Sequence, residues 1–120
     1  MITEDPAIAR YQSLGTTRFG LLARLAMAQS RPSSVEAAEL ILEIELLPLD
    51  GADRPRLVLS FAGVRDLVIR PFGFPVQLLD IDIEPIHDRQ WEHLNYKVVE
   101  GASRALSFHC ASFEADMSEP

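Results

Sequence analysis

Residues 79–84 alternate strictly between apolar and acidic side chains, a pattern that a β-strand accommodates and a helix does not. The apolar set is Leu79, Ile81 and Ile83, and the acidic set is Asp80, Asp82 and Glu84. Successive side chains of a strand point to opposite faces, so the segment predicts a strand with one buried face and one acidic face. We expect Ile81 and Ile83 to be buried at the centre of a sheet.

The same period of two recurs between residues 38 and 117 and predicts about six strands. The apolar positions that define the other five are Leu40, Leu42, Ile44 and Leu46; Leu57, Leu59 and Phe61; Leu67 and Ile69; Leu94, Tyr96 and Val98; and Leu106, Phe108 and Cys110. Short connections between them favour antiparallel neighbours.

Several residues predict where these strands turn or end. Asp50 and Gly51 favour a hairpin loop, because glycine readily takes a positive φ. Gly63 is expected to bend or reverse the chain, and Pro85 to end its strand, since proline donates no ladder hydrogen bond. The apolar phase slips after residue 110, which predicts a bulge near residues 111–112.

Residues 1–36 lack this alternation and are predicted to be helical. Pro6 suits the start of a first helix, and Phe19, Leu22 and Ala26 have the spacing of a second. Residues 31–34 read as a linker. Helices that precede the strands favour an α+β fold. We therefore expect one domain over residues 1–120, with a helical segment at 1–36 and a mostly antiparallel, curved sheet at 38–117.

Composition excludes several classes of function. A net charge of −7 argues against broad binding to nucleic acid, which requires a basic surface. A single cysteine, Cys110, excludes an internal disulfide and favours a reducing, cytoplasmic location. No apolar stretch has the length of a membrane helix, so we expect no membrane contact.

The outward positions of the predicted strands are unusually apolar for a face in water. They include Ile41, Val58, Val68, Leu78 and Val99. We expect this face to be half covered, by the N-terminal helices, by curvature of the sheet or by a second copy of the chain.

The acidic face of residues 79–84 permits two interpretations. If the strands were neighbours, Glu43 and Glu45 would join Asp80, Asp82 and Glu84, and such carboxylates, with His87, could hold a metal ion. Alternate residues of a strand are about 6.5 to 7 Å apart, however, which is too far for one ion without loop ligands. We therefore favour a solvated face, or one that meets arginines such as those between Arg10 and Arg31, from this chain or another protein.

Other motifs carry no catalytic signature. His109 and Cys110 are adjacent in sequence but should point to opposite faces of a strand, so they do not form a nucleophile and base pair. The chain has no nucleophile elbow, phosphate loop or dinucleotide glycine pattern. We expect no catalytic residues and no cofactor. Phe72, Phe74 and Trp91 lie in predicted turns and loops, where aromatic side chains often anchor protein interfaces.

The strand pattern resembles that of small uncharacterised bacterial α+β domains. The likeness rests on LVLSFAGVRDLVI at residues 57–69, LDIDI at 79–83 and LSFHC at 106–110, and it covers residues 38–115. Some of these domains are similar to immunity proteins of polymorphic toxin systems. The resemblance implies a protein that binds and blocks a cognate toxin without catalysis.

We therefore predict a non-catalytic domain that binds a protein partner or forms a homodimer. The residues predicted to contact that partner are Glu43, Glu45, Asp80, Asp82, Glu84, Phe72, Phe74 and Trp91. The alternatives are a metal-dependent enzyme that uses Asp80, Asp82, Glu84 and His87, and a domain that binds a small molecule between helices and sheet.

Overall fold

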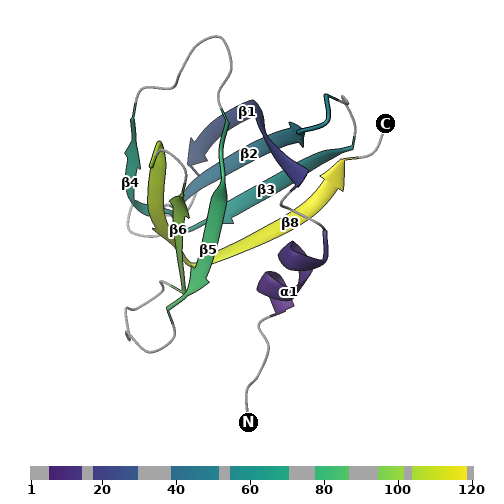
Figure 1. Ribbon diagram of the computed structural model, residues 1–120. Coiled ribbons are helices and arrows are strands. Elements are labelled where there is room, and N and C mark those ends of the chain that lie inside the picture. The colour runs from purple at the N-terminus through teal and green to yellow at the C-terminus, as the bar shows by residue number, and fades with distance from the viewer. Residues whose placement is uncertain are drawn as a thin grey trace.

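The computed structural model describes residues 6–14, 18–29, 39–51, 55–70, 78–86, 95–101 and 104–118. Within these ranges the chain forms one helix followed by eight strands (Figure 1). The elements are α1 Pro6–Ser13, β1 Phe19–Gln29, β2 Leu40–Pro48, β3 Arg56–Ala62, β4 Arg65–Ile69, β5 Ile81–Pro85, β6 Tyr96–Glu100, β7 Leu106–Cys110 and β8 Ser112–Ser118. They make two antiparallel four-stranded sheets, sheet A with the order β1-β2-β3-β8 and sheet B with the order β4-β7-β6-β5.

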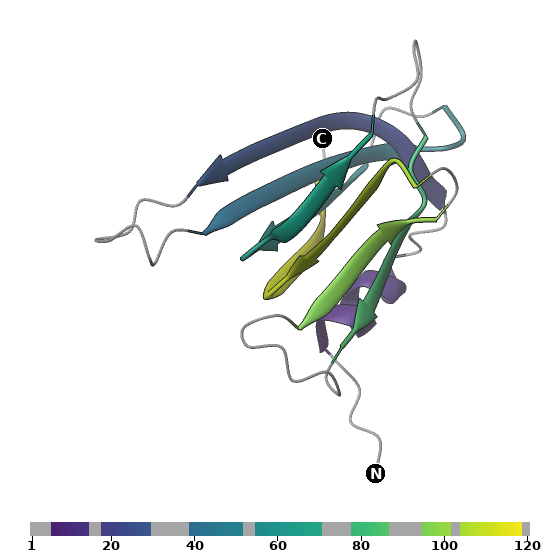
Figure 2. The same ribbon diagram turned by 90° about the vertical axis from the view of Figure 1, so that its left-hand side faces the viewer.

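One sharp bend connects the two sheets. β3 pairs with β8 in sheet A and β4 pairs with β7 in sheet B, so the same two segments of chain run side by side through both sheets. At the bend, the Ala111 N–H donates a 3.0 Å hydrogen bond to the Ala62 carbonyl oxygen, and Gly63 has a φ of 67°. The sheets consequently face each other as two layers (Figure 2).

The core lies between the layers, because the alternate apolar positions of both sheets point inward. Its fully buried members are Leu42, Ile44, Leu57, Leu59 and Phe61 from sheet A, and Val98, Leu106 and Cys110 from sheet B. The rings of Phe61 and Phe108 meet edge to face across the layers, with 4.9 Å between their centroids.

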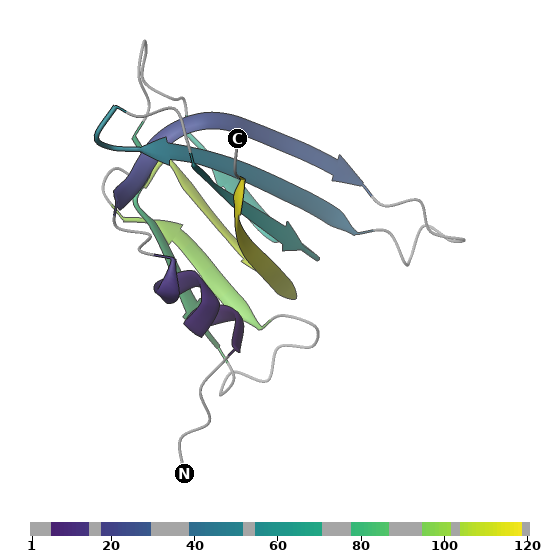
Figure 3. The same ribbon diagram turned by 90° about the vertical axis from the view of Figure 1, so that its right-hand side faces the viewer.

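Helix α1 closes one open side of this sandwich, between the edge strands β5 and β8 (Figure 3). The Tyr11 hydroxyl donates a 2.7 Å hydrogen bond to the Ile81 carbonyl oxygen on β5. Arg10 Nε lies 3.4 Å from the carbonyl oxygen of Ala115 on β8. The helix therefore satisfies backbone groups at both edges, which would otherwise be free to pair with another chain.

The structure confirms the predicted strands around Leu42, Leu59, Val98 and Phe108, and a turn at Gly51, whose φ is 89°. The predicted second helix is wrong, because residues 19–29 form β1. Register shifts between Phe19 and Arg24 break the alternation there, and beyond them the outward positions include alanines, which hide the contrast between faces. Pairing with β2 overrides the helix propensity of this leucine- and alanine-rich segment.

Two further expectations need correction. The strands form two facing sheets of four rather than one curved sheet of six. The phase slip after Cys110 marks the passage of the chain from sheet B to sheet A at Ala111, not a bulge within one strand.

Strand β5 also differs from the prediction. Leu79 and Ile81 are buried, but Ile83 is only half buried, because β5 lies at the edge of sheet B and not at its centre. The outer faces of the sheets are not covered by α1, which packs at their edges; Val68 and Leu78 are more than half exposed, at 53% and 54%. No helix in the described part of the chain is long and apolar enough to cross a membrane.

The close packing at the bend predicts that Gly63→Ala strongly destabilises the fold. A Cβ at this position would lie 2.9 Å from the Ala111 Cβ, and the positive φ adds strain. We expect the free energy of unfolding in urea to fall by about 2 to 3 kcal/mol. Gly51→Ala is the matched control, because its φ is also positive but nothing lies within 4 Å of the added Cβ. Its expected cost is about 1 kcal/mol, and equal losses in the two variants would contradict a tightly packed bend.

Candidate protein-binding site

The outer face of sheet B presents two regular rows of side chains. The strand registers place Val68, Ser107, Val99 and Asp82 in one row across β4, β7, β6 and β5. They place Arg65, His109, Lys97 and Glu84 in the next row. Each row therefore runs from an apolar or basic residue on β4 to an acidic residue on β5.

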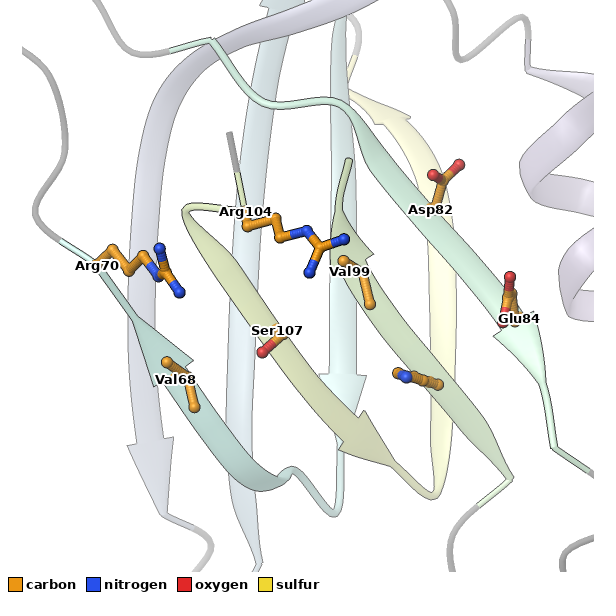
Figure 4. Close-up of a pocket in the computed structure, with 8 residues that line it drawn as sticks. Val68, Arg70, Asp82, Glu84, Val99, Arg104 and Ser107 are labelled. Carbon is orange, nitrogen blue, oxygen red and sulfur yellow. The ribbon is translucent and has the colours of Figure 1, made fainter. Parts of the chain in front are cut away.

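A hollow of about 450 Å³ occupies this face (Figure 4). Val68, Arg70, Asp82, Glu84, Lys97, Val99, Arg104 and Ser107 line it. Arg70 directly follows β4, and Arg104 precedes β7. In Figure 4 the Arg104 side chain extends toward Val99 on β6, while Asp82 and Glu84 stand apart on β5.

The charges of this hollow are not neutralised by one another. Among the described residues, no ion pair involves Arg70, Lys97, Arg104, Asp82 or Glu84, although Lys97 and Glu84 are register partners on adjacent strands. Their charged groups are therefore available to a molecule that docks on this face.

The outer face of sheet A has the opposite character. Arg24 on β1 donates to Glu45 at 3.0 Å and also to Glu43, both on β2. Hydrogen bonds to Glu45 and Glu43 raise the pKa of the Arg24 guanidinium above its usual value, so this arginine stays charged. Arg56 lies 3.7 Å from Glu45, and Arg10 bonds Asp116 at 2.9 Å.

The structure separates the acidic residues that the sequence grouped. Glu43 and Glu45 lie on sheet A, whereas Asp82 and Glu84 lie on sheet B, so the suggested common cluster is wrong. Arg10 and Arg24 do face acidic strands of their own chain, but they pair with Asp116, Glu43 and Glu45 rather than with the acids of residues 80–84. The role of Glu43, Glu45, Asp80, Asp82 and Glu84 in partner binding stays a prediction.

Three of the predicted contact residues, Phe72, Phe74 and Trp91, lie outside the described residues, as does His87. Asp80 and Asp82 both approach Gly101: a Cβ at that position would lie 3.5 Å from the Asp80 carboxylate and 3.0 Å from that of Asp82. Within the ranges that the structure describes, no three acidic, histidine or cysteine side chains are arranged to hold a metal ion.

Glu100 holds the end of sheet B that carries the hollow. This carboxylate is fully buried, and it accepts hydrogen bonds from the backbone N–H of Asp80 at 2.8 Å and of Ala105 at 3.2 Å. The Glu100 carbonyl oxygen also accepts from the Arg104 N–H at 3.1 Å. One side chain thus fixes both the approach to β5 and the turn that presents Arg104.

Sequence reasoning missed Arg70, Lys97, Arg104 and Glu100. Each of the three cations is a single charge in a different segment, so only the strand order reveals that they surround one hollow. Glu100 has one signal in the sequence: it occupies an inward position of β6, in phase with Tyr96 and Val98. A charged residue in that position requires hydrogen-bond partners in the core.

His109 and Cys110 point to opposite faces, as predicted. His109 is half buried on the outer face, where its Nδ1 lies 3.4 Å from the Asp66 carboxylate. Cys110 is fully buried, and this burial raises the pKa of its thiol to about 12. The thiol is therefore protonated at neutral pH and is a small apolar core residue.

Glu100→Gln tests the hydrogen bonds beneath the hollow. An amide keeps one acceptor but directs its NH₂ group at a backbone N–H, which leaves that donor without a partner. We expect the free energy of unfolding to fall by about 1 to 3 kcal/mol. Glu84→Gln, which changes the same groups at an exposed position, should stay within about 0.5 kcal/mol of the native chain. If the two variants unfolded at the same urea concentration, Glu100 would not have this role.

The state of Cys110 predicts its reactivity. At pH 8 the folded protein should not react with a disulfide-exchange reagent such as Ellman's reagent, because the thiol is buried and almost wholly protonated. After denaturation in guanidinium, one thiol per chain should react. Rapid stoichiometric reaction of the folded protein would contradict the burial of this residue.

Comparison with known protein families finds a match over residues 5–116, to the family described as immunity protein PIM8. No curated protein and no solved structure matches the chain significantly. The family match begins before α1 and continues into β8, so it includes both sheets and the hollow on sheet B. It confirms the resemblance seen in the strand pattern and extends it to the N-terminal helix. This chain is a member of the immunity protein PIM8 family.

Proposed function

We propose that this chain binds a cognate protein toxin through the outer face of sheet B and blocks it without performing any chemistry. Family membership supports the class of function. The observation that carries the choice of face is the contrast in charge pairing. The arginines of sheet A and α1 already bond acids of this chain, whereas the five charges of the hollow form no ion pair among the described residues.

The difference in charge pairing between the two sheets makes docking on sheet B more favourable than docking on sheet A. A toxin that bound sheet A would compete with existing contacts of Arg24 and Arg10. A toxin that bound sheet B would meet charges that form no ion pair among the described residues, together with the apolar surface of Val68 and Val99. Interfaces commonly combine such an apolar centre with a polar rim. A cytoplasmic location in the producing cell is part of this proposal.

The test uses the cognate toxin, which is sought first among the products of the genes that flank the gene of this chain. Co-expression with the native chain should restore growth of cells that carry the active toxin, and the purified chain should bind an inactivated form of it. Ser107→Trp should weaken binding and abolish protection, because the indole fills the hollow on the central strand β7.

Ser60→Trp is the matched control. Ser60 is a half-buried serine on the central strand β3, and it occupies the outer face of sheet A between Glu43 and Glu114. We expect this variant to protect like the native chain, and thermal unfolding should show that both variants fold. A native chain that neither bound nor protected would refute the function, and a loss confined to Ser60→Trp would assign binding to sheet A.

A further inference from the structure

The hollow on sheet B is divided by charge sign. Its cations are Arg70 beside β4, Arg104 at the start of β7 and Lys97 on β6, while its acids, Asp82 and Glu84, are both on β5 (Figure 4). Crossing the face from β4 to β5 therefore means crossing from positive to negative charge. The two signs meet between β6 and β5, where Lys97 and Glu84 are register partners.

The positive part contrasts with the chain as a whole. The net charge is −7, yet the hollow carries three cations and two acids. Beyond the Debye length of about 8 Å at physiological ionic strength, the field of the exposed charges is largely screened. Within that distance the net charge favours the approach of a basic toxin, and inside the hollow the three cations act directly on the group that enters.

The backbone at Arg104 provides a second, independent observation. Its φ is 55°, in the left-handed region that glycine adopts more readily than a residue with a Cβ. Glu100 holds this turn through its carbonyl oxygen and, at Ala105, through its carboxylate. Arg104 thus occupies a position where glycine would be more favourable for folding, and its side chain lines the hollow. Backbone strain of this kind is often found at functional positions.

On these grounds, and resting on the proposed function, we propose that the hollow receives an acidic side chain of an otherwise basic toxin. Arg70, Lys97 and Arg104 bind the incoming carboxylate, and Asp82 and Glu84 bind a basic side chain of the toxin beside it. The apolar surface of Val68 and Val99 lies under the contact. The two signs together fix the orientation of the toxin, because a toxin turned by half a revolution would bring like charges together.

The first experiment is a charge swap, with binding of the inactivated cognate toxin as the readout. Lys97→Glu combined with Glu84→Lys exchanges two register partners, so the net charge and the cross-strand pairing are preserved while the local polarity is inverted. We expect an affinity loss of about 10- to 100-fold.

The matched control exchanges two residues on sheet A, Arg24→Glu with Glu43→Arg, which likewise leaves the net charge unchanged. We expect native affinity from this variant. If the swap on sheet B bound like the native chain, or the swap on sheet A alone weakened binding, the proposal would be overturned. A native chain that did not bind the toxin at all would instead refute the proposed function.

The second experiment separates folding from binding. Arg104→Gly removes both the backbone strain and the guanidinium, so we expect a melting temperature equal to or above that of the native chain. The same variant should lose at least about 10-fold in toxin affinity, because a charged hydrogen bond to the toxin carboxylate is lost. Unchanged affinity in a folded Arg104→Gly variant would show that this arginine does not contact the toxin.

Discussion

The bend at Gly63 and Ala111 is the constraint on which the rest of the molecule depends. Here the paired segments β3–β4 and β7–β8 turn together from sheet A into sheet B. Only because both segments bend at the same level do the apolar faces of the sheets meet and bury Phe61 against Phe108. The close approach of Gly63 to Ala111 leaves no room for a Cβ, so the corner is set by packing as well as by φ.

Because of the bend the molecule has two outer faces, one on each sheet. The ion pairs of the N-terminal segment are formed with sheet A. Arg24 of β1 neutralises acids on sheet A, and Arg10 of α1 does so at the edge strand β8. Toward sheet B, α1 donates the hydrogen bond of the Tyr11 hydroxyl to the Ile81 carbonyl oxygen. The arginines of the basic N-terminal segment therefore pair with acids of sheet A. Among the described residues they form no ion pair with the charged side chains of the hollow on sheet B.

The sequence predicted the strands whose inward and outward residues differ most in polarity, such as β2, β3 and β7. It did not predict β1, because the strand contains irregular register and because alanines, which count as apolar, stand on its outer face. Nor does alternation distinguish a single sheet from two facing ones, since either arrangement buries every second residue. For the same reason, the sequence suggested a cluster of Glu43 with Asp82, which the sheet order places on opposite faces.

The sequence could not predict the hollow, because its three cations come from three separate segments of the chain. The backbone around the hollow is held by Glu100, which lies beneath it. Glu100 is buried without exposure, so the turn that carries Arg104 is held by hydrogen bonds that water does not weaken. In the proposed complex, a face held in this way would lose little conformational entropy on docking. In the proposed complex a mixed arrangement of charges would add selectivity, because a toxin with the wrong pattern must bury unpaired charge against it.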